Sequence, residues 1–192
     1  MEKIILIGGG GHCKSVIDVI REEGEFEIAG IIDSNLPKGS SILGYKILGD
    51  DSIIKDLVKD YINFHITVGQ LQSSSIRRNL SNLLLENGAT IPNIISPFAH
   101  ISSFSKLGIG ITVLHRVTIQ ADCEIGDFCI LNDHSLIEHD VKIGKYCHIA
   151  TSATINGNVT IEDGVFIGSG AVVVQGSKIK SETFVKANHL FK

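Results

Sequence analysis

Apolar and polar positions follow two different patterns along this chain, and the pattern changes near residue 90. Before that point, short apolar runs alternate with segments that repeat apolar residues at helical spacing. We predict strands over 3–7, 28–32 and 64–68, and helices over 12–23, 50–61 and 76–87. This β-α-β order favours a small parallel sheet, so residues 1–90 are predicted to form an α/β, Rossmann-like domain.

From residue 91 the apolar positions recur with a period of six. All fifteen residues at every sixth position from Ile101 to Val185 are Ile, Leu or Val. This period matches neither the helical repeat of about 3.6 nor the alternation of a strand, and it is the signature of a parallel β-helix. The fourth residue after each repeat start is usually small or β-branched. We expect both positions to point into an all-β domain of hexapeptide repeats over residues 91–192.

Composition narrows the class of protein. The chain has 192 residues, a net charge of -4 and 43% hydrophobic residues, which describes a globular protein rather than a nucleic-acid-binding one. No apolar run approaches the about 18 residues of a membrane helix, and the N-terminus lacks the features of a signal peptide. We therefore expect a cytoplasmic protein with no membrane partner.

The spacing of the cysteines does not suggest a metal site. The four cysteines contain no Cys-x-x-Cys pair, and Cys123, Cys129 and Cys147 all occupy the small inward position of the repeat. They are predicted to be buried core residues, and no metal is expected.

One histidine of the repeat domain has the surroundings of a general base. His139 occupies an outward position between Glu138 and Asp140, and a carboxylate beside an imidazole can fix its tautomer. The alternative is a solvated histidine on a charged surface. Gly157 lies 18 residues after His139, so the two are expected to stack on adjacent coils, where a glycine allows close approach to its N–H.

A glycine-rich loop, Gly8-Gly9-Gly10-Gly11, follows the first predicted strand and opens the first predicted helix. This placement suits an anion, because backbone N–H groups at a helix N-terminus point outward. The third glycine of a dinucleotide fingerprint would fall at Cys13, so that fingerprint is incomplete. Asp33 still follows the second strand, where a ribose-binding acid belongs. A mononucleotide site fits these 90 residues better than an NAD site.

Taken together, the two halves resemble a known family. The segments Gly-Gly-Gly-Gly-His-Cys-Lys-Ser-Val and Asn-Asp-His-Ser-Leu-Ile-Glu-His-Asp, followed by Tyr-Cys-His-Ile and Asn-Gly-Asn-Val, are similar to the NeuD/PglD group of sugar acetyltransferases. These belong to the hexapeptide-repeat acyltransferase superfamily, and the resemblance covers nearly the whole chain. It implies a left-handed β-helix, a homotrimer with active sites between neighbouring prisms, and acetyl-CoA as the acetyl donor.

The resemblance also implies roles for individual residues. His139 matches the catalytic base and Asp140 the acid that supports it; the family has Glu at the position of Asp140, so Glu138 remains an alternative. The residues implied for acetyl-CoA are His148, Gly157, Gly168 and Ser169. The residues implied for the nucleotide sugar are Gly10, Gly11, His12, Asp33, Ser34, Gly69, Gln70 and Asn132.

The predicted function is transfer of an acetyl group from acetyl-CoA to a UDP-linked 4-amino sugar of bacterial glycan biosynthesis. The alternatives are O-acetylation of a sialic acid or related nonulosonic acid, a non-catalytic nucleotide-sugar-binding protein, and an NAD-binding regulator. One departure supports the non-catalytic alternative: residues 185–192 lack the Gly-x-Pro-Ala-Lys-like tail that helps to cover coenzyme A in the family. The sequence does not identify the sugar.

Overall fold

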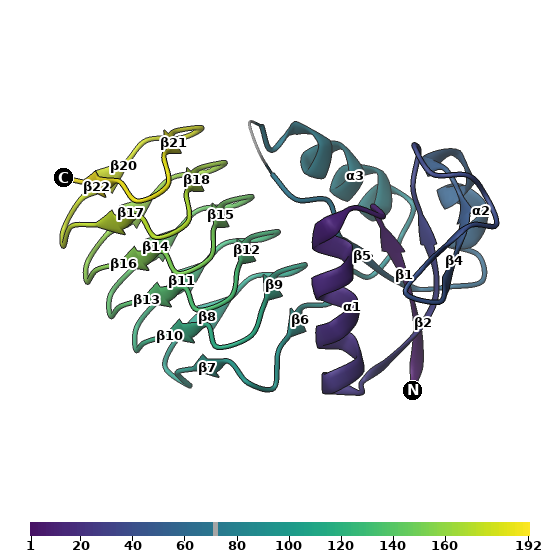
Figure 1. Ribbon diagram of the computed structural model, residues 1–192, viewed down its shortest axis with the longest axis horizontal. Helices are drawn as coiled ribbons and strands as arrows, with labels where there is room; N and C mark the ends of the chain where they lie inside the picture. Colours follow the sequence, from purple (N-terminus) through teal and green to yellow (C-terminus); the bar gives the residue numbers. More distant parts are fainter. Residues whose placement is uncertain (71–72) are drawn as a thin grey trace. The chain divides into compact units, whose positions relative to one another are not determined.

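The computed structural model describes residues 1–70 and 73–192, and its contacts divide the chain into two units. The N-terminal unit comprises Met1–Gly69 and Ser75–Ile94. The second unit comprises Gln70–Ser74 and Ile95–Lys192. We call this second unit the prism, because three sheets wind around one core (Figure 1).

The N-terminal unit is built on a five-stranded sheet with strand order β3-β4-β2-β1-β5. Strands β1, β2, β4 and β5 run parallel, and only β3 pairs antiparallel, with β4. The strands are β1 (Glu2–Ile7), β2 (Phe26–Ile32), β3 (Ser41–Ile42), β4 (Tyr45–Gly49) and β5 (Asn63–Ile66). The helices are α1 (Gly11–Glu23), the 3-10 helix η1 (Asp51–Ile53), α2 (Ile54–Leu57) and α3 (Ser75–Glu86).

Helix α1 forms where apolar residues recur on one face, and that face is buried. The helix ends at Gly24, whose φ of 72° is in the left-handed region and whose N–H donates to the carbonyl of Ile20. The parallel sheet predicted for the first half of the chain is confirmed. The first and last helices of this half also lie near their expected bounds.

One local prediction differs from the structure, and one element was not predicted. The helix expected over 50–61 is reduced to η1 and α2, because Lys59 and Asp60 donate to carbonyls only three residues back. Only Ile54 is buried in this segment, so no apolar face holds a longer helix. The hairpin of β3 and β4 was not predicted; it turns through Leu43 and Gly44, which have φ values of 47° and 90°.

The prism consists of two-residue strands, each paired in parallel with the strand 18 residues later, as in Ile119↔Ile137. Sheet I has the order β22-β19-β16-β13-β10-β7, sheet II β20-β17-β14-β11-β8 and sheet III β21-β18-β15-β12-β9-β6. The bounds are β6 (Ile94–Ile95), β7 (His100–Ile101), β8 (Lys106–Leu107), β9 (Thr112–Val113), β10 (Thr118–Ile119), β11 (Glu124–Ile125), β12 (Ile130–Leu131), β13 (Leu136–Ile137), β14 (Lys142–Ile143), β15 (His148–Ile149), β16 (Thr154–Ile155), β17 (Thr160–Ile161), β18 (Phe166–Ile167), β19 (Val172–Val173), β20 (Lys178–Ile179), β21 (Phe184–Val185) and β22 (Leu190–Phe191). The predicted β-helix of hexapeptide repeats is confirmed.

Both inward positions of the repeat fill one continuous core, as expected. The corners between the sheets are made by residues in the left-handed region, with φ from 56° to 61°, at six-residue intervals: Arg116, Asp122, Phe128, His134, Asp140, Tyr146, Ser152 and Asn158. Most are not glycine, so the corners can carry functional side chains.

Candidate functional site

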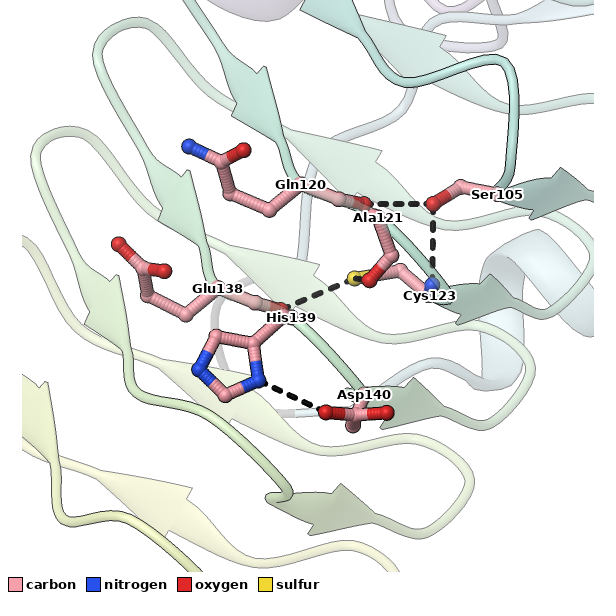
Figure 2. A network of polar contacts seen from close by, with 7 residues as sticks. All are labelled: Ser105, Gln120, Ala121, Cys123, Glu138, His139 and Asp140. Carbon is pink, nitrogen blue, oxygen red and sulfur yellow. Dashed lines mark hydrogen bonds and ion pairs between the residues drawn. The ribbon is translucent and has the colours of Figure 1, made fainter.

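His139 lies at the corner between β13 of sheet I and β14 of sheet II. Its Nδ1 is 2.7 Å from Oδ2 of Asp140, and the two side chains are 56% and 52% exposed. When Nδ1 carries the proton that Asp140 accepts, the lone pair of Nε2 is left for a substrate proton. In Figure 2 the carboxylate of Glu138 points away from the imidazole, so Asp140 is the acid in contact with it.

Gly157 lies one coil further along the same edge, directly against the imidazole. The N–H of the next residue, Asn158, donates to the carbonyl of His139 at 2.9 Å. A Cβ at Gly157 would lie 2.6 Å from Cε1 and 2.9 Å from Nε2 of His139. The stacking predicted from the 18-residue spacing is therefore confirmed. Glycine is needed here for space, since any side chain would displace the histidine.

A second group of predicted residues gathers on sheet III. His148, in β15, is buried, and its Nε2 is 3.1 Å from the side-chain amide of Asn132. The backbone N–H of Gln70 lies 3.4 Å from Nδ1 of the same ring. Phe166, in β18, meets the ring edge-on with a centroid distance of 5.0 Å. The imidazole of His148 is thus held from three sides.

The side chain of Gln70 makes its contacts within the prism. Its side chain is 2% exposed, and its Nε2 donates to the carbonyl of Gly164 at 2.9 Å. Gln70 belongs to the prism, whereas its neighbour Gly69 belongs to the N-terminal unit. A role for Gln70 in binding nucleotide stays a prediction, and its side chain is already bonded within the prism.

The two prism groups lie apart in one chain. His139 is at the edge between sheets I and II, and that edge is opposite sheet III, which carries His148. Gly168 and Ser169 follow β18 of sheet III, so they belong with His148 rather than with His139. A single copy therefore holds the predicted base on one side of the prism and most of the predicted acetyl-CoA residues on another.

In the N-terminal unit, the predicted nucleotide residues follow the carboxyl ends of parallel strands. Gly10, Gly11 and His12 follow β1, Asp33 and Ser34 follow β2, and Gly69 follows β5. Because β1 lies between β2 and β5, these loops share one edge of the sheet. Oδ2 of Asp33 accepts the N–H of Gly9 at 2.6 Å, and Oδ1 accepts the N–H groups of Asn35 and Leu36 at 2.8 and 3.1 Å. The carboxylate of Asp33 therefore shapes the loops themselves.

Two histidines of this unit are held neutral. Burial, with further contributions from His65 and Arg77, lowers the pKa of His12 from 6.5 to about 3. Burial also lowers the pKa of His65 to about 4, although its Nδ1 lies 3.0 Å from the carbonyl of Pro92. Near neutral pH, His12 therefore carries no positive charge. Sequence reasoning did not find His65, which sits among the apolar residues of a buried strand.

Sequence reasoning also missed contacts made by the inward-facing thiols. The four cysteines are buried, as predicted. However, Sγ of Cys123 lies 2.9 Å from the carbonyl of Glu138, beside His139 (Figure 2). Across residues 1–70 and 73–192, no cluster of three or more His, Cys, Asp or Glu side chains is arranged to hold a metal ion. In the same residues, no helix combines the length and apolar character needed to cross a membrane.

Comparison with known proteins matches both units. Residues 3–84 match the family model of the PglD N-terminal domain, and residues 122–157 match that of the bacterial transferase hexapeptide, six repeats. GDP-perosamine N-acetyltransferase of Escherichia coli O157:H7 is 30% identical over 176 residues, which cover 89% of this chain and 77% of that relative.

Solved structures share the fold over the whole chain. PerB from Caulobacter crescentus, in complex with CoA and GDP-perosamine, is 30% identical with a TM-score of 0.93, and the match covers 100% of this chain and 89% of PerB. The acetyltransferase domain of PglB from Neisseria gonorrhoeae FA1090, in complex with acetyl coenzyme A, has a TM-score of 0.88 at 24% identity, covering 99% and 92% of the two chains. The latter likeness is one of fold.

Proposed function

Because this chain belongs to the hexapeptide-repeat acetyltransferases that carry a PglD N-terminal domain, we propose that it transfers the acetyl group of acetyl-CoA to the amine of a nucleotide-linked 4-amino sugar. Within this acetyltransferase, the observation that carries the proposal is the contact of His139 with Asp140 above Gly157. The relatives at 30% identity act on or bind GDP-perosamine.

In the proposed reaction, the substrate amine attacks the thioester carbonyl while Nε2 of His139 takes a proton from its nitrogen. Asp140 accepts the Nδ1 proton throughout, so that the imidazole keeps one orientation and the imidazolium is stabilised. The new amide forms as the carbon–sulfur bond breaks, and the imidazolium gives its proton to the departing sulfur, so that coenzyme A leaves as the thiol. The N–H of Gly157 is the proposed donor to the oxyanion, because this glycine lies directly against the imidazole of the base.

The site is proposed to be completed by a second copy of the chain. His139 and His148 lie on opposite sides of one prism, so both can serve one reaction only if sheet III of one copy faces the His139 edge of another. Repeating this head-to-tail contact with closure gives a ring, and the family resemblance implies that this ring is a homotrimer.

A subunit-mixing experiment tests this assembly. His139→Ala and His148→Ala variants are each expected to be nearly inactive as homotrimers. Trimers assembled at random from equal amounts should regain activity, because each mixed trimer contains one site with both histidines, which is about one site in four of the whole population. Failure of the mixture to gain activity, in trimers shown to be mixed by mass, would contradict a shared site.

The identity of the nucleotide that carries the sugar, UDP or GDP, is a separate question. The family resemblance implies UDP, whereas the named relatives act on or bind GDP-perosamine. The neutral His12 gives no preference, because both nucleotides present the same diphosphate. Comparing kcat/KM for UDP- and GDP-linked 4-amino sugars decides between them.

The experiment that tests the proposed function measures thiol release from acetyl-CoA with both nucleotide sugars and with sialic acids. His139→Ala is expected to lower kcat by about 10²- to 10⁴-fold, the usual contribution of a general base. His100→Ala, which removes an exposed histidine from β7, is the control and should retain activity. Turnover with sialic acids alone would replace the proposal by O-acetylation. Absence of turnover with every acceptor would favour the non-catalytic alternative.

A further inference from the structure

Four inward-facing side chains of the prism share one hydrogen-bond geometry. Each donates its O–H or S–H to the carbonyl of the residue fifteen positions later, at the same corner of the next coil. The contacts are Ser105 to Gln120 at 2.6 Å, Cys123 to Glu138 at 2.9 Å, Cys129 to Gly144 at 3.0 Å and Cys147 to Glu162 at 3.1 Å. A thiol or hydroxyl in the core therefore ties one coil to the corner of the next.

Only one of these four contacts acts at the corner that carries His139. The carbonyl of Glu138 belongs to the peptide group that continues into the nitrogen of His139. On the far side of the histidine, the N–H of Asp140 donates to the carbonyl of Ala121 at 3.2 Å. Figure 2 shows the thiol of Cys123 directed at this corner from the preceding coil. The backbone is thus held immediately before and after the imidazole.

We propose that Cys123 is a positioning residue for the acetyl transfer. Its thiol holds the Glu138 carbonyl, and this keeps the His139 imidazole in hydrogen-bond contact with Asp140. This inference rests on the proposed function of His139. Cys123 does not touch the reacting atoms, since its side chain is 1% exposed within the core.

The chemistry of the buried thiol supports this role. Burial raises the pKa of Cys123, so the sulfur keeps the proton that it donates. The thiol donates to the Glu138 carbonyl, and loss of this donor would favour a rotated peptide group. Rotation at this peptide changes where the Cα–Cβ bond of His139 points. A small displacement of a catalytic group costs far more activity than stability.

The chain itself provides the rescue and the control. Ser105 makes the same contact one coil earlier with a hydroxyl, so Cys123→Ser keeps a donor at the same place. Cys129→Ala removes the same kind of contact at the edge between sheets II and III, away from His139. Cys147 is unsuitable as a control, because it directly precedes His148.

The test compares Cys123→Ala, Cys123→Ser and Cys129→Ala in the full chain. Both alanine variants should lower Tm by similar amounts, because each loses a buried sulfur and its contact with the next coil. Only Cys123→Ala should lower kcat, by about 10-fold or more, with KM for acetyl-CoA unchanged. Cys123→Ser should restore most of the kcat. Equal kcat in the two alanine variants, or no rescue by serine, would overturn the proposal.

A second readout separates this proposal from the proposed function. The imidazole nitrogens of His139, assigned with a His139→Asn variant, report by nitrogen NMR which nitrogen carries the proton in the neutral ring. The Nδ1–H tautomer should dominate in the parent, Cys123→Ser and Cys129→Ala proteins and lose population in Cys123→Ala. This result would support positioning by Cys123 even if no acceptor is turned over. An unchanged tautomer in Cys123→Ala would overturn it.

Discussion

The prism and the N-terminal unit arrange their candidate site residues by different means. In the prism, each backbone pairing carries a side chain to the same place one coil later, so residues 18 apart form columns. His139 and Gly157 are neighbours for this reason alone. In the N-terminal unit, the candidate residues sit in loops of individual shape, and Asp33 is engaged with three backbone N–H groups of those loops.

The two units also differ in what their cores contain. The prism core consists of aliphatic side chains and small residues. The N-terminal unit buries His65 completely and holds His12 with its Nε2 buried, so ionisable groups are part of its interior. We therefore expect substitutions in the prism to act on catalysis through geometry. In the N-terminal unit, changes of pH should act on stability and substitutions on substrate affinity.

The largest expected effect is that of Gly157→Ala. The added Cβ would occupy the position of the imidazole edge, and the side chain of His139 can rotate away more easily than backbone can move. We expect kcat to fall about 100-fold, as for a catalytic group displaced by about an ångström, with little change in Tm. Steady-state kinetics and thermal unfolding measure the two quantities.

Two controls sharpen the Gly157 experiment. In a His139→Ala background, Gly157→Ala should have no further effect on kcat, because nothing is left to displace. Gly126→Ala would bring its Cβ to 2.7 Å from the backbone carbonyl carbon of Gly144, so it should lower Tm instead. A Gly157→Ala protein that keeps its kcat would show that the imidazole tolerates displacement.

This contrast explains how much could be predicted from the sequence. The six-residue period predicted the β-helix, its inward positions and the stacking of His139 with Gly157, because one repeated pairing determines all of them. It did not predict which thiols donate to corner carbonyls, since the contact of Cys123 with Glu138 depends on distances that a periodic pattern does not contain. That His148 lies opposite His139 follows from the order of the three sheets.

The N-terminal unit was less predictable, for a physical reason. Its strands and long helices follow from apolar periodicity, but the short segments between them are shaped by single hydrogen bonds. The helix expected over 50–61 stops at Leu57, and the β3–β4 hairpin depends on two residues with positive φ. The burial of His65 arises from packing between distant segments, as its contact with Pro92 illustrates.

The next effect concerns acid stability of the N-terminal unit. The folded pKa values of His12 and His65, about 3 and about 4, lie below the value of 6.5 of the unfolded chain. The contribution of these neutral histidines to the free energy of unfolding is fully present above pH 6.5. It is lost as pH falls below that value, because the unfolded chain then binds protons that the folded unit does not. At pH 5 each histidine should lower the free energy of unfolding by about 2 kcal/mol.

Helical circular dichroism measures this loss selectively, because every helix of the described residues lies in the N-terminal unit. Urea unfolding followed by this signal at pH 7 and pH 5 gives the difference in free energy. His65→Asn keeps a side chain that can donate to the Pro92 carbonyl and removes one of the two titrating groups. It should therefore show about half of the pH dependence. A pH dependence equal to that of the parent protein would mean that His65 is not its source.

The smallest expected effect is that of Asp33→Ala, and it falls on substrate affinity rather than on turnover. Removing the carboxylate frees the N–H groups of Gly9, Asn35 and Leu36, so the loops at the strand ends lose their shared anchor. We expect KM for the nucleotide sugar to rise about 5-fold, equivalent to about 1 kcal/mol for hydrogen bonds of this kind, with kcat unchanged. Asp33→Asn keeps one acceptor and should show a smaller rise, while Asp56→Ala removes an exposed carboxylate from the same unit and should show none. A fall in kcat without a change in KM would mean that Asp33 takes part in the acetyl transfer. The loops of the N-terminal unit would then act on turnover, as the corners of the prism do, and the contrast between the two units would no longer hold.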